Sequence, residues 1–307
     1  MNLYNKKICI LGHNDCFAKG LIKQLLSLHT QLHILEQPSH LFNLNNMNFL
    51  DTLLLNKNSV DDNNIEIIKE ADIIINLTLS PTPNTLARNI YPIIKFNEYL
   101  VNHIQPNGLL IHLTPLIIKD SFSAYNSLFH NISTSITHKL SNYIILNVGH
   151  IIASDDSFIR DICDLIYLTK SAMPYGKHRV SLIDKQSLIL SIIKIIQGNS
   201  NTKSYDLAYV SQCQINDIVS IISQNMWGIN NIKALPTPIM KFLLFMKKHH
   251  LYSLNKNYLN TILQSKKTSV STLGLKDLGI IQPSIDFIVN QELSYILNNR
   301  KNQINRI

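Results

Sequence analysis

The most constraining feature of this sequence is a short stretch at residues 71–78, which contains three consecutive isoleucines at 73–75. A strand with one face in water alternates apolar and polar residues, so an unbroken β-branched run predicts a strand that is covered on both faces. Such strands occur almost only in parallel sheets, where helical connections cover both faces. Residues 109–114 form a second, mostly apolar run. The sequence therefore predicts an α/β fold.

Strand and helix patterns alternate through the first 150 residues. We expect strands at residues 8–11, 31–36, 49–55, 71–78, 109–114 and 143–148, separated by helices and loops. This alternation predicts a doubly wound parallel sheet. Beyond residue 150 the elements become short and mixed. We therefore expect a sheet domain at residues 1–150 and a smaller lobe at residues 151–307 that interleaves with the sheet edge.

The chain opens with a short apolar run, a turn at residues 12–18 and an amphipathic run. Strand, tight turn and helix in this order open the Rossmann-type dinucleotide-binding fold, in which three glycines shape the turn. Here these positions hold Gly12, Asp15 and Ala18. Ala is small and Asp tolerates a left-handed backbone, so the turn can form. The Asp15 carboxylate would, however, occupy the positive end of the helix where phosphate binds, and a plain strand, loop and helix explain this spacing equally well.

The second expected strand ends at Glu36, just before Pro38. In a dinucleotide-binding fold, this position meets the adenosine ribose. A carboxylate there bonds the ribose hydroxyls and repels a 2′-phosphate, so Glu36 favours NAD over NADP. A solvated Glu at the end of a strand is an equally good explanation.

The charge of the chain limits its partners. There are 28 basic and 20 acidic residues, which give a net charge of +8. The lysines are scattered and form no basic stripe interleaved with aromatic residues, so we expect no nucleic-acid groove. A mildly basic surface suits anionic lipid or an acidic partner. Trp227, the single tryptophan, lies on an apolar helical pattern and is expected in the core.

The cysteines and the apolar runs bear on compartment and metal binding. No pair among Cys9, Cys16, Cys163 and Cys213 has metal-ligand spacing, which favours a reducing compartment and argues against structural zinc. No histidine pair has a metal-binding pattern, so we expect no metal. No apolar run reaches the roughly 18 residues of a membrane span, and no signal peptide is expected. These features predict a cytoplasmic protein without a transmembrane segment, which binds at most to the inner face of the inner membrane.

Several segments resemble one family. The turn at residues 12–18 stands where that family has a Gly-Gly-Ser-Gly-Phe-Leu-Gly type turn, and residues 123–125 (Ser-Ala-Tyr) stand at its Ser-x-Tyr-x-x-x-Lys motif. Residues 154–160 are similar to its Gly-Pro-Glu-Asp-x-Phe-x-Asn segment, and residues 273–280 to its Leu-x-x-Leu-x-Asp-Leu-Gly-Ile ending. With these matches the chain resembles the extended and atypical short-chain dehydrogenases/reductases, which are NAD-dependent epimerase/dehydratase-like proteins. Within that group it is most similar to the NAD(P)-binding accessory subunit of respiratory complex I (the alpha-subcomplex subunit nine family) and its bacterial homologues.

The resemblance implies a catalytic site in which one residue differs from the family motif. In catalytic members a Tyr transfers the proton, a Lys four residues later lowers the pKa of that Tyr, and a Ser or Thr binds the substrate oxygen. Thr114 and Tyr125 are present here, but Phe129 replaces the Lys. A tyrosine with an ordinary pKa of about 10 is a poor base at neutral pH. Lys139 is a substitute in principle, and so is His130, although on a helix His130 points away from Tyr125.

Three hypotheses follow from this resemblance. The first is a non-catalytic or vestigial protein that binds NAD or NADP or has lost the cofactor, and that docks on complex I subunits or an anionic membrane surface. The second is an active epimerase or reductase that acts on a sugar nucleotide or another carbonyl substrate, with Thr114 and Tyr125 in the catalytic roles. The third is a scaffold with an empty cleft. The residues expected to line the cofactor are Gly12, Asn14, Asp15, Cys16, Phe17 and Ala18 at the phosphates, Glu36 at the ribose, and Asn76, Leu77 and Thr78 at the stacking edge.

Overall fold

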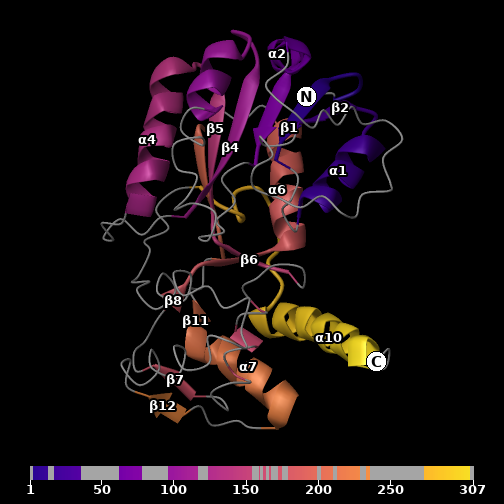
Figure 1. Cartoon of the computed structure of the whole chain (residues 1–307), viewed down its shortest axis with the longest axis vertical. Helices are drawn as coiled ribbons and strands as arrows, with labels where there is room; N and C mark the ends of the chain where they lie inside the picture. The colour runs from indigo at the N-terminus through magenta and orange to yellow at the C-terminus, as the bar shows by residue number, and fades with distance from the viewer. Residues whose placement is uncertain are drawn as a thin grey trace.

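The computed structural model describes residues 3–12, 17–35, 62–77, 96–116, 124–153, 159, 162–163, 166, 172–174, 179–198, 202–209, 213–228, 233–235 and 273–304. Its centre is a six-stranded sheet in the order β10-β5-β4-β3-β1-β2 (Figure 1). The strands are β1 (Lys7–Leu11), β2 (Gln31–Leu35), β3 (Ile73–Asn76), β4 (Leu109–Pro115), β5 (Tyr143–Val148) and β10 (Ser204–Leu207). All neighbouring strands pair in parallel, which confirms the predicted α/β class. The strand expected at residues 49–55 lies outside the described residues.

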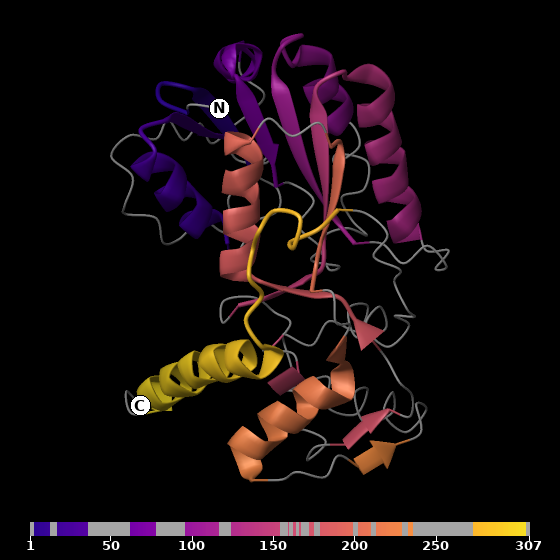
Figure 2. The same cartoon turned by 180° about the vertical axis from the view of Figure 1, so that it is seen from behind.

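Helices cover both faces of the sheet. On one face Ile8, Ile10, Ile73, Ile75 and Ile111 share a core with α1 (Ala18–Ser27) and α6 (Lys185–Gln197), and Figure 2 shows these two helices side by side. On the other face Cys9, Leu11, Ile74 and Leu110 share a core with α2 (Asp62–Glu70), the helix over residues 96–103, and α4 (Ala124–Lys139). Every residue of β3 is buried, which explains its continuous apolar run.

The chain beyond residue 150 leaves the sheet and returns to it. β6 (His150–Ile152) pairs with β9 (Leu182–Asp184), which leads directly into α6, and β10 then closes the sheet edge. At the turn out of β5, a Cβ on Gly149 would lie 2.7 Å from the backbone oxygen of Ser181, so the crossing segments approach too closely for a side chain at this position.

The remaining elements lie beyond one end of the sheet (Figures 1 and 2). α7 (Ile215–Trp227) packs on α10 (Ile285–Ile304), and both helices contribute to the same core as α1 and α6. Two short strand pairs complete this part: β8 (Arg179–Val180) with β11 (Cys213–Gln214), and β7 (Ala172–Pro174) with β12 (Lys233–Leu235). Trp227 is 48% exposed, so its expected place in the core is wrong. It is the last residue of α7, where the helix has left the apolar surface.

Residues 273–280, which carry the Leu-Gly-Leu-Lys-Asp-Leu-Gly-Ile ending, lie along the outer edge of the sheet. The backbone N–H of Asp206 donates to the oxygen of Leu273 at 2.9 Å, so this segment extends the sheet beyond β10. Lys194 from α6 donates to the carbonyl oxygens of Leu278 and Gly279 at 2.8 and 3.1 Å. Through these hydrogen bonds, the segment that precedes α10 is bound to the sheet domain.

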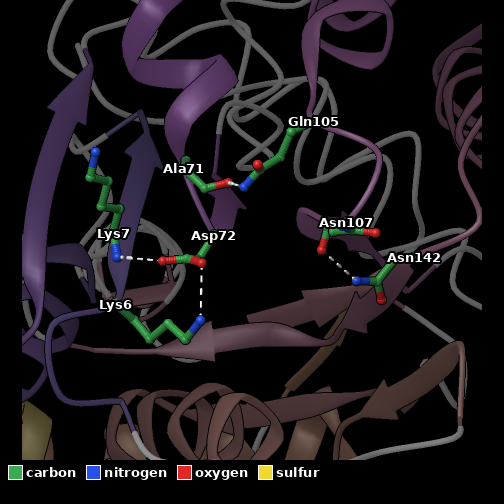
Figure 3. A network of polar contacts seen from close by, with 7 residues as sticks. All are labelled: Lys6, Lys7, Ala71, Asp72, Gln105, Asn107 and Asn142. Carbon is green, nitrogen blue, oxygen red and sulfur yellow. Dashed lines mark hydrogen bonds and ion pairs between the residues drawn. The ribbon is translucent and has the colours of Figure 1, made fainter.

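Polar contacts close the amino ends of the strands (Figure 3). Asp72, just before β3, accepts hydrogen bonds from the backbone N–H of Lys7 at 2.9 Å and from Nζ of Lys6 at 3.0 Å. Partial burial opposes ionisation of Asp72, but these two donors prevail and hold the pKa of its carboxyl below the ordinary value. Gln105 donates to the oxygen of Ala71 at 2.6 Å in the same row. In open α/β sheets, ligands bind at the opposite edge, outside the carboxyl ends of the strands.

Candidate functional site

Gly12 begins the predicted phosphate-binding turn at the carboxyl end of β1. That strand lies inside the sheet, between β3 and β2. Gly12 has φ of 81°, in the left-handed region where a side chain is strained, and its N–H donates to the oxygen of Leu35 at 3.0 Å. The backbone thus turns sharply at the point where a dinucleotide-binding fold places its first glycine.

The end of the same turn leads directly into α1. Phe17 and Ala18 are buried, so their side chains do not face a ligand. Phe17 provides no side-chain cap, and the first turn of α1 contains no acidic residue. The N–H groups at this helix start are therefore not taken by a side chain of the helix, as phosphate binding requires. Asn14, Asp15 and Cys16 lie outside the described residues.

A glycine that sequence analysis did not single out brings two helices together beside this turn. A Cβ on Gly20 would lie 2.6 Å from Cδ1 of Ile189, so α1 and α6 approach closely at this point. The glycine spacing of the turn did not indicate this contact, because α6 comes from a part of the chain more than 160 residues away.

The end of β3 is buried more deeply than a stacking edge would be. Asn76 and Leu77 are 0% and 2% exposed. Nδ2 of Asn76 donates to Oδ1 of Asn97 at 2.9 Å and lies 3.1 Å from Nδ1 of His112. The Asn76 side chain is thus held inside the protein. Thr78 and Glu36 lie outside the described residues.

These contacts define a buried polar cluster of Asn76, Asn97 and His112, and the buried Thr114 lies two residues further along β4. Asn76 and His112 face each other in the register between β3 and β4. His112 and Thr114 occupy alternate positions of β4 and therefore point to the same face of the sheet. Sequence analysis missed Asn97 and His112. The available signal was that Asn76 and His112 each interrupt an apolar strand that is covered on both faces.

Burial sets the charge of His112. Its side chain is fully buried, and desolvation lowers its pKa from the ordinary value to about 3. The ring is therefore neutral at physiological pH. Its Nε2 atom has no hydrogen-bond partner among the described residues, and neither does Oγ1 of Thr114.

The predicted catalytic pair is split between β4 and α4. Thr114 is buried near the carboxyl end of β4, and Tyr125 is in the first turn of α4, the helix that follows β4 in the chain (Figure 1). Phe129, four residues after Tyr125, is fully buried in the core that α4 shares with the sheet. This position therefore faces the apolar interior and carries no cation.

The two proposed substitutes lie elsewhere on α4. Lys139 donates to Oδ1 of Asn102 at 3.2 Å, and it is 14 residues along the helix from Tyr125, a rise of about 21 Å. His130 is exposed, whereas Phe129 faces the core. The lysine position of the family motif is therefore filled by an apolar side chain, and the side chain of Tyr125 lies outside the described residues.

The described residues contain no group of three or more His, Cys, Asp or Glu side chains placed to hold a metal ion. In the same parts of the chain, no helix has both the length and the apolar character needed to span a bilayer. Cys9, Cys163 and Cys213 are buried thiols.

No protein family model matches the sequence, and no curated protein matches it. Among solved structures, the chain is similar to a UDP-glucose 4-epimerase from Thermotoga maritima in complex with UDP-glucose, with TM-score 0.65, 10% identity, and coverage of 95% of this chain and 99% of that one. An NAD-dependent NDP-hexosamine 5,6-dehydratase involved in tunicamycin biosynthesis gives TM-score 0.62 and 10% identity over 96% and 98% of the two chains.

A short-chain dehydrogenase/reductase superfamily protein from Agrobacterium tumefaciens with bound NAD gives TM-score 0.61 and 11% identity, and the match covers 98% of this chain and 99% of that chain. Identities this low show the fold alone. The matches span nearly the whole of both chains, so the likeness includes the elements beyond residue 150. The chain therefore has the Rossmann-type fold that these NAD-dependent and nucleotide-sugar proteins share.

Proposed function

We propose that this protein binds a nicotinamide dinucleotide along the carboxyl edge of its sheet and uses it on a nucleotide-linked sugar or a similar carbonyl substrate. The observation that carries the proposal is the left-handed Gly12 at the carboxyl end of β1, followed by the start of α1, where Phe17 provides no side-chain cap. Among the described residues, this backbone fits a pyrophosphate, because the first turn of α1 contains no acidic side chain to compete with phosphate. The similar solved structures, which include one with UDP-glucose and one with NAD, support this substrate class.

In this proposal the residues of the chain bind and orient the reacting groups. The backbone at Gly12, Phe17 and Ala18 holds the phosphates, and the Thr114 hydroxyl binds the substrate oxygen. Tyr125 exchanges the proton of that oxygen. When bound, the nicotinamide supplies hydride acceptance and return. Because Phe129 stands where the family has the lysine that lowers the pKa of the tyrosine, we expect slow proton transfer at neutral pH and an activity that rises toward alkaline pH.

The cofactor arm of the proposal is tested by thermal unfolding with NAD⁺, NADH, NADP⁺ and NADPH. A ligand at about 100 times its dissociation constant stabilises the folded state by about 2.7 kcal/mol. For a chain of this length, this raises the Tm by about 4 °C. No rise with any of the four nucleotides at millimolar concentration overturns the proposal.

The chain offers a matched control for this experiment. Gly228, which ends α7, also has positive φ (65°), and no atom lies within 4 Å of a Cβ at this position. Gly12→Ala and Gly228→Ala are therefore both expected to lose about 1 kcal/mol through backbone strain. Only Gly12→Ala is expected to lose the cofactor-induced rise in Tm.

A second candidate function, a non-catalytic cofactor binder, is favoured by one observation, the buried Phe129 at the lysine position. NAD⁺ with UDP-glucose, followed by absorbance at 340 nm and by sugar analysis, separates the two functions. Turnover that disappears in Tyr125→Phe supports the enzyme, whereas cofactor binding without turnover supports the binder. Docking on complex I subunits or on anionic membrane belongs to this second candidate, and sedimentation with anionic vesicles tests the membrane arm.

A further inference from the structure

Two polar atoms on β4 are buried without a partner in the described structure. They are Nε2 of His112 and Oγ1 of Thr114. Each unsatisfied group of this kind is expected to destabilise the folded protein by about 1–3 kcal/mol. Two hydrogen bonds are thus left unmade on one strand of the sheet, at the edge where ligands bind in this fold. This needs a physical explanation.

The neighbouring amides determine what His112 offers. Nδ2 of Asn76 carries two hydrogens and lies within hydrogen-bond distance of both Asn97 Oδ1 and His112 Nδ1. With this orientation of the amide, Nδ1 of His112 accepts a hydrogen bond. The proton of the neutral ring is then on Nε2, and the unpartnered atom is a donor.

Thr114 supplies a second donor next to it. The Cα atoms of alternate residues in a strand lie about 6.7 Å apart, and their side chains point to the same face. At this spacing, two donors on one face can share one oxygen atom placed between them. An oxygen accepts two hydrogen bonds in this way when it belongs to a carbonyl, an amide or a sugar hydroxyl.

We propose that His112 is a ligand-binding residue, and that its Nε2–H and the hydroxyl of Thr114 together hold one oxygen atom of the bound dinucleotide or sugar. This inference rests on the proposed function and adds a residue to it. Two neutral donors in a dry site stabilise a partial negative charge on that oxygen without any change in their own protonation. They thus supply part of the polarisation for which Phe129 provides no cation.

The first measurement concerns the protein without ligand. In protein labelled with ¹⁵N-histidine, the His112 signals are identified as those missing from His112→Gln. We expect a neutral ring at pH 7 with its proton on Nε2. A charged ring, or a ring protonated on Nδ1, overturns the inference whether or not any ligand binds.

The second measurement adds NAD⁺ alone, and then NAD⁺ with UDP-glucose. A shift of the Nε2–H signal with NAD⁺ alone assigns the oxygen to the cofactor, and a shift only in the second arm assigns it to the sugar. If NAD⁺ raises the Tm but the signal moves in neither arm, the inference is overturned and the proposed function stands. If no nucleotide raises the Tm, the proposed function fails and the inference fails with it.

Variants give an independent result that folding alone cannot produce. Thr114→Val removes a buried, unpartnered hydroxyl, so it is expected to raise the Tm and yet to weaken NAD⁺ or UDP-glucose binding about tenfold, the loss of one hydrogen bond. Ser223→Ala is the matched control, because Oγ of Ser223 is also buried without a partner among the described residues, on α7. It is expected to raise the Tm and to leave binding unchanged. Equal affinities for both variants and the wild type overturn the inference.

His112 itself is tested with a conservative pair. His112→Gln keeps an acceptor for Asn76 and a donor in place of Nε2–H, so its affinity is expected to stay within about threefold of wild type. His112→Leu removes both groups and is expected to bind about tenfold more weakly. Similar losses in the two variants would show that His112 acts through packing, which contradicts the inference.

Discussion

The buried His112 predicts a specific loss of stability in mild acid. In the unfolded chain its imidazole has a pKa of about 6.5, whereas burial lowers the folded pKa to about 3. Between these values the unfolded state binds a proton that the folded state does not bind. The free energy of unfolding therefore falls as the pH falls below 6.5, and it continues to fall until about pH 3.

The magnitude follows from linkage. Each pH unit in this window costs about 1.36 kcal/mol per proton, so lowering the pH from 7 to 5 removes about 2 kcal/mol through His112. The result at pH 5 is the same for any folded pKa well below 5. Desolvation also lowers the pKa of His150, to about 4, which adds a second loss of similar size to the wild-type protein.

Urea denaturation of wild type and His112→Gln at pH 7, 6 and 5 isolates the contribution of His112. Gln does not titrate and keeps an acceptor for Asn76, so the variant should lose about 2 kcal/mol less than wild type between pH 7 and pH 5. The His150 contribution is present in both proteins and cancels. His138→Gln, on an exposed position of α4, serves as the control for the substitution itself. Equal losses in wild type and His112→Gln would refute the reasoning, because they would mean that His112 takes up its proton in the folded state.

Four further substitutions test the packing around the site, each by urea denaturation. Asp184 caps the N-terminus of α6 and accepts a hydrogen bond from the Tyr209 hydroxyl at 2.6 Å. Asp184→Ala removes both interactions and should lower the free energy of unfolding by about 3 kcal/mol. Tyr209→Phe keeps the cap and should lower it by less. Gly149→Ala should cost about 2 kcal/mol or more, because its Cβ would meet the Ser181 backbone and not a movable side chain. Phe129→Lys should destabilise the protein by more than about 3 kcal/mol and restore no activity, since this position faces the core.

Local patterns were enough to predict the sheet. The isoleucines at 73–75 required cover on both faces, and the structure provides it with α1 and α6 on one side and α2 and α4 on the other. Gly12 was also predictable from a local pattern, because the turn after the first strand needs a residue that tolerates positive φ. Each of these signals depends on a few consecutive residues.

The contacts that shape the site depend on residues distant in the chain. The Asn76–His112 contact joins residues 36 positions apart and requires the register of β3 on β4, which the sequence does not specify. The close approach at Gly20 requires Ile189, from a helix that enters the sheet domain after the excursion through β6 and β9. Trp227 was expected in the core but is exposed, because an apolar helical pattern does not reveal where a helix leaves the core.

The buried Phe129 changes how the missing lysine should be understood. A lysine at this position would have to place its ammonium in the core beneath α4, which is costly without a charged partner. Phe129 instead fills that space and fixes α4 on the sheet beside Leu110 and Ile132. We expect electrostatic help for a reacting oxygen to come from neutral donors, which need no counter-charge and are worth more in a dry site than in water. Among the described residues of β4, His112 and Thr114 have buried polar atoms without a hydrogen-bond partner, so we expect these two residues to provide that help.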